Sequence, residues 1–270
     1  MYILSANISN IFIDKLFPLI YNYVRRIVYI KKQKQCIKLH NITTFNYTFM
    51  YYMKRTIYHG SEFIIEKPIH LKGNVHNDYG LGFYCCTSAI LAKEWASKRS
   101  GHGYVNKYEI RDDRLKILDL TKPPFDNVLY WISLLMHNRE LSSDLRNLYP
   151  RELKYLEDNY LIDITKYDII IGYRADDSYF HFPEAFVRSE ITIDSLNTIF
   201  QAGNLGKQYV ILSKRAFNLI KFISFQETFL DSKEDYYKRR KNADKVFADL
   251  LIKDRYSNAK RLKDMVMDDE

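Results

Sequence analysis

The sequence predicts an α+β fold. Runs of strand length alternate irregularly with runs of helical length, and the regular strand–helix–strand repeat of a doubly wound sheet is missing. Of the 270 residues, 47% are hydrophobic and 27% are charged, which is typical of a folded globular protein. We therefore divide the chain into an N-terminal extension (1–52), a central domain (53–230) and a C-terminal tail (231–270).

The strands are predicted from short β-prone runs bounded by turn residues. The first run ends in a Gly–Ser turn, and the second is led by glycines. The expected strands are Lys54–Ser61, Gly80–Thr87, Tyr104–Ile110, Leu115–Leu120, Tyr167–Gly172, Gln208–Ser213 and Ile220–Phe225.

The helices are predicted from apolar spacing and from capping residues. Ser88 is a plausible N-cap for a helix over 89–99, in which Trp95 belongs to the apolar stripe, and we expect Trp95 and Phe83 in the core. Ser213 is a plausible N-cap for a short helix that follows it. The other expected helices are Asn127–Asn138, 180–188 and 193–202.

The positive charge of the chain is unevenly placed. Forty-one Lys and Arg against 33 Asp and Glu give a formal charge of +8. Residues 1–52 hold seven basic residues and one acidic residue, so the rest of the chain is close to neutral. A basic chain with 23 Tyr favours nucleic-acid binding, but the charge of the central domain does not imply it. A nucleic-acid binder acting through residues 1–52 is kept as an alternative.

The extension and the cysteines indicate the compartment. Leu16–Val24 is too short to span a bilayer and lacks a signal cleavage site. The extension is either a basic amphipathic segment that contacts a membrane or partner, or a leader or mis-assigned start. The three cysteines (Cys36, Cys85 and Cys86) form no CxxC motif, and the histidines show no ligand spacing. We expect a cytoplasmic protein with no disulfide framework and no metal.

The tail, residues 231–270, combines eleven basic and ten acidic residues with an apolar stripe. Val246, Phe247, Leu250 and Leu251 form that stripe at helical spacing. The pattern predicts an amphipathic helix, which either binds a partner or packs on its own domain.

Three motifs occur in order along the central domain. They are Tyr58-His59-Gly60-Ser61, Gly80-Leu81-Gly82-Phe83-Tyr84 and Gly206-Lys207-Gln208-Tyr209-Val210. No GxxxxGK[ST], GxGxxG, HExxH or GxSxG motif is present, which excludes the commonest nucleotide-binding, zinc-protease and hydrolase patterns.

The order of these motifs resembles the ADP-ribosyltransferase fold of the diphtheria-toxin and poly-ADP-ribose-polymerase branch. There a His-Gly pair, a Gly-x-Gly-aromatic-Tyr strand and a Glu-led strand line one NAD cleft. More closely, residues 53–230 resemble a bacterial family, domain of unknown function 3990, placed in that superfamily. The matching motifs are Tyr58–Ser61, Gly80–Tyr84, Trp95-Ala96, Ile170–Phe180 and Leu205–Ser213. The resemblance implies a split β-sandwich with surrounding helices, followed by the helical tail.

The resemblance also implies a catalytic set of His59, Tyr84 and Gln208, with NAD as co-substrate. Breaking the bond from nicotinamide to ribose passes through an oxocarbenium-like transition state. His59 would donate a hydrogen bond to the adenosine-side ribose, the Gly60 backbone would approach the nicotinamide amide, and Tyr84 would stack on its ring.

Further residues are implied around NAD and the acceptor. Arg174 would bind the pyrophosphate, or else form an internal ion pair with a neighbouring Asp. The expected cofactor-binding residues are Gly60, Ser61, Gly82, Phe83 and Arg174, and the expected substrate-side residues are Asp176, Asp177 and Tyr179.

Gln208 departs from the superfamily pattern, because relatives carry a catalytic Glu there. A Gln can orient the ribose but supplies neither charge nor base, so a base would come from Asp176 or Asp177. The departure disfavours polymer synthesis and favours mono-transfer or binding alone.

The expected function is NAD-dependent mono-ADP-ribosyl transfer to an unknown macromolecule, or NAD glycohydrolysis, in a bacterial toxin or defence protein with a cognate antitoxin protein. The alternative is a non-catalytic NAD- or ADP-ribose-binding module that acts through a protein partner.

Overall fold

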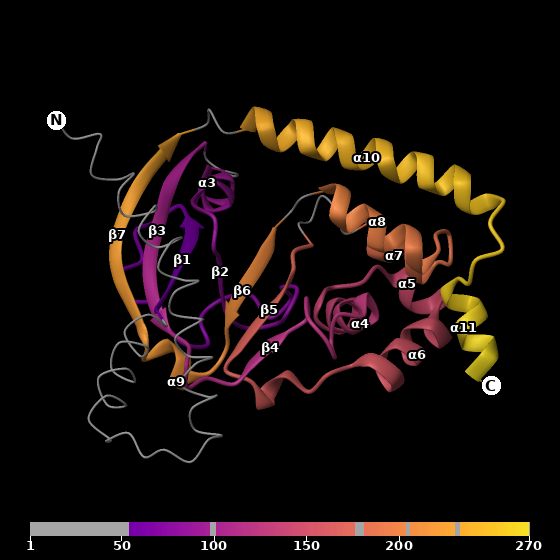
Figure 1. The fold of residues 1–270 in the computed structure, drawn as a ribbon, viewed down its shortest axis with the longest axis horizontal. Helices are drawn as coiled ribbons and strands as arrows, with labels where there is room; N and C mark the ends of the chain where they lie inside the picture. The colour runs from indigo at the N-terminus through magenta and orange to yellow at the C-terminus, as the bar shows by residue number, and fades with distance from the viewer. Residues whose placement is uncertain (1–53, 98–100, 176–180, 204–205, 230–232, 270) are drawn as a thin grey trace, which may run out of the picture. The chain divides into compact units, whose positions relative to one another are not determined.

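The computed structural model divides the chain into two units, Met1–Tyr52 and Met53–Glu270. It describes residues 54–97, 101–175, 181–203, 206–229 and 233–269. These belong to the second unit, shown in Figure 1, so the predictions for residues 1–52 lie outside the described residues.

In the described part of the chain, seven strands form one hydrogen-bonded sheet, in the order β4-β5-β6-β2-β1-β3-β7. All neighbours are antiparallel except β4 and β5, which are parallel. The strands are β1 (Lys54–Ser61), β2 (Phe83–Cys86), β3 (His102–Arg111), β4 (Ile117–Asp119), β5 (Ile169–Tyr173), β6 (Lys207–Ile211) and β7 (Ile220–Phe229).

The ladder of the sheet is weakest between β1 and β2. β1 pairs with β3 along its whole length, from Lys54 opposite Arg111 to Ser61 opposite Tyr104. In contrast, β1 meets β2 at a single position, Tyr58 opposite Cys86. The sheet is therefore continuous, but a single paired position joins β1 to β2.

Helices pack on both halves of the sheet. α3 contacts β1, β2 and β3, whereas α4 to α8 gather beside the β5–β6 half (Figure 1). The helices are α3 (Ala89–Ser97), α4 (Val128–Asn138), α5 (Ser143–Leu148), α6 (Pro150–Tyr160), the 3-10 helix η1 (Ile164–Lys166), α7 (His181–Val187), α8 (Ile193–Gly203), α9 (Lys214–Phe217), α10 (Lys233–Arg255) and α11 (Leu262–Asp269).

Glycines let α3 lie directly against the strand backbones. A Cβ on Gly60 would stand 1.9 Å from the Ala92 carbonyl oxygen, and one on Gly103 would stand 2.2 Å from that of Ala96. Real Cβ atoms do not approach backbone this closely, so a side chain at either position would push the helix away. The glycine of the Tyr-His-Gly-Ser motif thus holds α3 over the end of β1.

Two apolar cores stabilise the sheet. The larger joins α4 and the later helices to the sheet through residues such as Trp131, Ile170 and Val210, all inaccessible to solvent. The smaller lies among the strands and α9, where Ile57, Tyr108 and Ile211 are buried together.

The α+β class is confirmed, and each predicted strand is present, with β2 shorter and β7 longer than expected. Ser213 is the N-cap of α9, as predicted, because its side chain accepts a hydrogen bond from the Ala216 N–H. Helices α5 and α6 were not predicted. The expectation that Trp95 is a core residue is wrong, since 40% of it is exposed.

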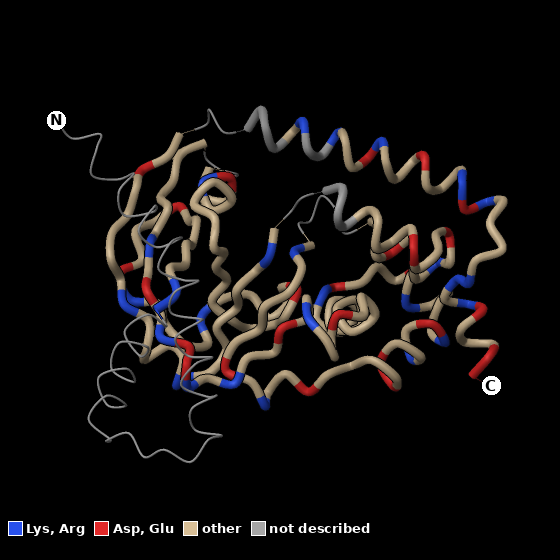
Figure 2. The backbone as a smooth tube through the Cα atoms, in the orientation of Figure 1, with Lys and Arg blue, Asp and Glu red and all other residues tan. Residues whose placement is uncertain are grey.

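The tail packs on its own domain. α10 lies along α8, and Ala243 and Asp254 on α10 are almost inaccessible. The Asp254 carboxylate accepts hydrogen bonds from the Thr192 N–H (2.7 Å) and the Ser195 hydroxyl (2.9 Å) at the start of α8. Basic and acidic residues both occur along the described part of α10 (Figure 2).

We predict that Asp254→Ala lowers the free energy of unfolding by about 2–4 kcal/mol, because it leaves two buried donors of α8 without an acceptor. Asp249→Ala, at an exposed position of α10, is the matched control and should change it by less than ~0.5 kcal/mol. Urea unfolding followed by circular dichroism measures both. Equal effects of the two substitutions would show that Asp254 does not anchor the tail.

Candidate functional site

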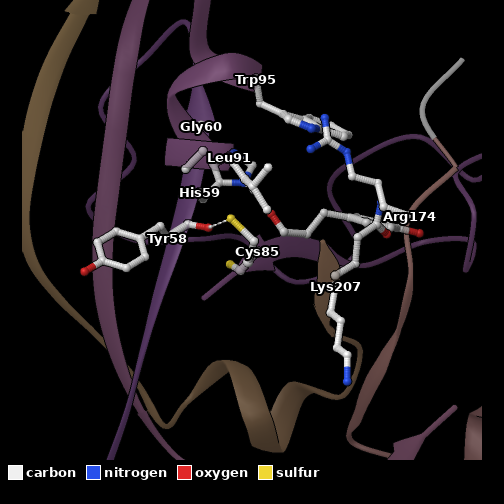
Figure 3. Close-up of a pocket in the computed structure, with 12 residues that line it drawn as sticks. Tyr58, His59, Gly60, Cys85, Leu91, Trp95, Arg174 and Lys207 are labelled. Atoms are coloured by element: carbon white, nitrogen blue, oxygen red, sulfur yellow. Dashed lines mark hydrogen bonds between the residues drawn. The ribbon is translucent and has the colours of Figure 1, made fainter. Parts of the chain in front are cut away.

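A pocket lies where β1 and β2 part, and α3 covers it (Figure 3). It contains about 360 Å³ of empty space, part of which is open to solvent. Its lining residues are Tyr58, His59, Gly60, Tyr84, Cys85, Cys86, Leu91, Ala92, Trp95, Arg174, Lys207 and Gln208. The pocket thus combines residues from all three sequence motifs.

Strand register explains why distant motifs meet here. Tyr58 lies opposite Cys86, and Cys86 lies opposite Gln208, so these three side chains share one face of the sheet. Gly60 and Tyr84 lie two residues further along β1 and β2, so they lie on the same face. That face is the one that α3 covers.

His59 bridges the gap between the two strands. Its ring Nδ1 lies 2.7 Å from the Tyr84 carbonyl oxygen, which can only accept a hydrogen bond. Nδ1 therefore carries the proton, and the side chain replaces the ladder bond that β1 no longer makes there.

The protonation state of His59 fixes what the ring can offer a ligand. Burial lowers the pKa of His59, although the bond to Tyr84 opposes this shift. The neutral ring then presents Nε2 as an acceptor. The expected role of His59 toward ribose stays a prediction; with its proton on Nδ1, the neutral ring has no second N–H to donate.

Tyr84 can contribute its ring but not its hydroxyl. The hydroxyl donates to the Gly80 carbonyl (2.7 Å) and accepts from the Tyr79 N–H (3.0 Å). Burial raises the pKa of Tyr84 well above its ordinary value, so it stays neutral. Tyr84 lines the pocket as a fixed aromatic wall and not as an acid or base.

Gln208 is buried behind the pocket, with 5% of it exposed. Its Nε2 donates to Asp78 Oδ2 over 3.2 Å, while its Oε1 has no hydrogen-bond donor among the described residues. Asp78 also accepts from the Ala175 N–H (2.9 Å) and pairs with Arg139 Nε (3.1 Å). A buried acceptor without a donor is unusual and indicates a place for a ligand group.

Asp78, which contacts Gln208, was not among the site residues predicted from the sequence. It is 4% exposed, and burial raises its pKa to about 6, although Arg139, the Ala175 N–H, Arg174 and Gln208 all favour the ionised form. In the sequence it ends a polar loop before a glycine, where Asp is a common turn residue. Only the fold brings it to Gln208.

Arg174 lies on the opposite wall from His59, over the ring of Trp95 (Figure 3). Its guanidinium carbon is 4.4 Å from the Trp95 ring centroid, a cation–π contact, and 6% of the residue is exposed. Arg174 lowers the pKa of Asp78, so it faces that carboxylate as well as the pocket. Trp95, predicted as core, is instead part of the pocket wall.

The remaining expected residues divide into three groups. Gly60 lines the pocket, as do the three predicted catalytic residues. Ser61, Gly82 and Phe83 are not among the lining residues, and Phe83 packs into the smaller core and against the His59 ring. Asp176, Asp177 and Tyr179 lie outside the described residues.

Two other lining side chains, those of Cys86 and Lys207, are engaged in hydrogen bonds. The Cys86 thiol donates to the Ser88 carbonyl (3.1 Å), and burial raises its pKa, so the reactive thiolate is disfavoured. The Lys207 amine donates to the Thr121 hydroxyl (2.8 Å) and points away from His59 (Figure 3). In the described ranges, no group of three or more His, Cys, Asp or Glu side chains is placed to hold a metal ion.

The molecule so defined is an α+β protein with a pocket where two central strands of the sheet separate. The chain belongs to the family described as "Protein of unknown function (DUF3990)", whose model matches residues 55–222. This agrees with the family resemblance of the five motifs. No curated protein and no solved structure matches the chain. No helix in the described part of the chain is long and apolar enough to cross a membrane.

We predict that Asp78 makes stability depend on pH. Its pKa rises from 3.8 when unfolded to about 6 when folded, so the native state binds the proton more tightly. The resulting stabilisation is complete below the lower value and is lost as the pH rises through the higher one. The pKa difference corresponds to ~3 kcal/mol.

The measurement is the free energy of unfolding of wild type and Asp78→Asn from about pH 4 to pH 7. The wild-type value minus the variant value should fall across this range. The lowered pKa of His59 acts in the opposite direction, but both proteins contain His59, so its effect cancels. Parallel curves would contradict the assignment.

Proposed function

We propose that this protein cleaves the nicotinamide–ribose bond of NAD and transfers ADP-ribose as a single unit to an acceptor. The observation that carries the proposal is that His59, Tyr84 and Gln208, from three separate motifs, line one pocket. The proposal includes a fold relationship to ADP-ribosyltransferases. A sheet nearly parted between β1 and β2, with the pocket at the parting, supports that relationship.

The contacts of the pocket suggest how NAD would bind. The ring of Tyr84 would support the flat nicotinamide, and the Gly60 backbone has no Cβ to keep the amide away. One ribose hydroxyl would donate to Gln208 Oε1, which is buried and has no donor among the described residues. Another would donate to His59 Nε2, because Nδ1 is already bonded to the Tyr84 carbonyl. Arg174, held by the Trp95 ring, would meet the pyrophosphate charge.

The reaction itself would be a substitution at the ribose anomeric carbon. The bond to nicotinamide breaks and its electron pair leaves with the neutral base. The acceptor then forms the new bond and loses a proton, and water as acceptor gives hydrolysis. No Asp or Glu is among the lining residues, so the cationic transition state has no direct negative partner in the described pocket. This favours slow mono-transfer over polymer synthesis.

A non-catalytic NAD- or ADP-ribose-binding module is the second candidate function. The neutral Gln208 amide favours it, because an amide can hold a ribose without supplying charge. Such a module would act through a protein partner. A nucleic-acid function gains no support from the described residues, along which basic and acidic side chains are interleaved (Figure 2).

The biological setting proposed is that of a cytoplasmic bacterial toxin or defence protein, with a cognate antitoxin protein. This part of the proposal follows from superfamily analogy alone.

We predict that purified protein releases nicotinamide from labelled NAD, and that His59→Ala lowers the rate by about 100-fold or more. His59→Asn separates structure from chemistry, because its amide N–H can still donate to the Tyr84 carbonyl but offers no Nε2. It should fold like wild type and remain slow. His137→Ala, at a half-exposed position outside the pocket, is the control and should leave the rate unchanged.

The outcomes distinguish the two candidates. Saturable NAD binding without nicotinamide release or label transfer would overturn the enzyme proposal and leave the binding module. Absence of any NAD binding would overturn both.

A further inference from the structure

Only the nitrogen of the Gln208 side-chain amide has a hydrogen-bond partner among the described residues. Nε2 faces the Asp78 carboxylate at 3.2 Å, and Oε1 is buried with no donor among the described residues. Asp78 is not a lining residue of the pocket, whereas Gln208 is. Nε2 therefore points into the protein, and Oε1 is the amide atom left for a ligand.

We propose that Asp78 is a positioning residue whose carboxylate locks the Gln208 side-chain amide in one orientation. In that orientation the amide presents its oxygen, a hydrogen-bond acceptor, to the pocket. The pocket then selects a ligand group that donates a hydrogen bond. The lock follows from the chemistry of the pair. An ionised carboxylate only accepts hydrogen bonds, so it must face Nε2. Turning the amide over would set Oε1 against a negatively charged oxygen.

Asp78 is itself held on both oxygens. Oδ2 accepts from the Ala175 N–H at 2.9 Å as well as from Gln208, and Oδ1 lies 3.1 Å from Arg139 Nε. A carboxylate fixed by two other elements cannot turn to follow the amide, so the amide conforms to the carboxylate.

Orientation, and not negative charge, is what Asp78 supplies. Two guanidinium groups, those of Arg139 and Arg174, act on this one carboxylate. The group is therefore not negative overall and would not by itself stabilise a cation in the pocket. The selected ligand group is a hydroxyl or an N–H, and a ligand that offers only acceptors leaves Oε1 unpaired. In naming a ribose hydroxyl of NAD as that group, the inference rests on the proposed function.

A test that needs no ligand reads the amide directly. In protein labelled with nitrogen-15, the Gln208 side-chain signal is identified by its loss in Gln208→Met. At a pH where Asp78 is ionised, the Gln208 amide protons should exchange with water at least about tenfold more slowly than those of an exposed Gln. In Asp78→Asn this protection should fall. Rapid exchange in wild type would overturn the proposal, whether or not NAD binds.

A second test measures selectivity. Calorimetry compares NAD with its analogue that lacks the 2′-hydroxyl of the nicotinamide-side ribose. Wild type should prefer NAD by about tenfold or more, and Asp78→Asn should lose most of that preference. A merely structural residue would weaken both ligands equally and leave the ratio unchanged. An unchanged ratio of the two affinities in Asp78→Asn would overturn the proposal.

Asp168→Asn is the matched control. Asp168 is similarly buried and hydrogen-bonded, to the Lys116 N–H and the Ser213 hydroxyl, but it does not line the pocket or contact Gln208. This substitution should leave the NAD preference unchanged.

If Asp78→Asn does not fold, the pH dependence of the same ratio in the wild type replaces it. Protonated Asp78 can donate to either orientation of the amide, so the preference should fall as the pH drops through about 6. The charged and titratable groups that face Asp78 are Arg139, Arg174, Tyr79 and Tyr84. The arginines stay charged, and burial keeps the tyrosines neutral. The measurement is made in a His59→Asn background, which removes the histidine that lines the pocket. A preference for NAD over its analogue that stays constant with pH would overturn the proposal.

These results separate the inference from the proposed function. A protected Gln208 amide without NAD binding would reject the NAD proposal and keep the Asp78 lock. NAD binding with an unprotected amide would do the reverse.

Discussion

The hydrogen bond from the His59 ring to the Tyr84 carbonyl holds β1 beside β2 after their ladder has ended at Tyr58 and Cys86. Continued pairing would have set the Gly60 backbone against Tyr84 and left no space between the strands. Instead a side chain spans the gap, α3 covers it, and Gly60 lets that helix approach the strand. The positions of Gly60, Tyr84 and the α3 residues that line the pocket depend on this arrangement, so His59 has a structural role beside its proposed chemical one.

The strands could be predicted from the sequence because their signals are local, whereas the grouping of His59, Tyr84 and Gln208 was predicted from the family resemblance. Glycines before a strand, a Ser N-cap and a run such as Ile169–Gly172 each specify their own backbone. Helices α5 and α6 were missed since their mean hydropathy is low and only Leu145 and Leu156 are buried. Trp95 was misplaced because apolar spacing cannot tell a core stripe from a pocket wall.

Asp78 shows what sequence reasoning could not supply. Its contacts, Arg139, Ala175 and Gln208, lie 61, 97 and 130 residues away along the chain. A polar network assembled over such separations leaves no local pattern. Gln208 and Asp78, the two partners of this hydrogen bond, are both buried, so replacing either would leave the other without its hydrogen-bond partner. These residues therefore serve both the pocket and the stability of the fold.

The stack of Arg174 on Trp95 has an optical consequence. The chain contains two tryptophans, and Trp131 is inaccessible in the larger core while Trp95 is 40% exposed beside the pocket. The indole of Trp95 therefore senses the charge and polarity of whatever enters, whereas that of Trp131 is shielded. With Trp131 replaced by Phe, fluorescence excited where tryptophan absorbs and tyrosine does not would come from Trp95 alone, so the molecule carries its own reporter of occupancy.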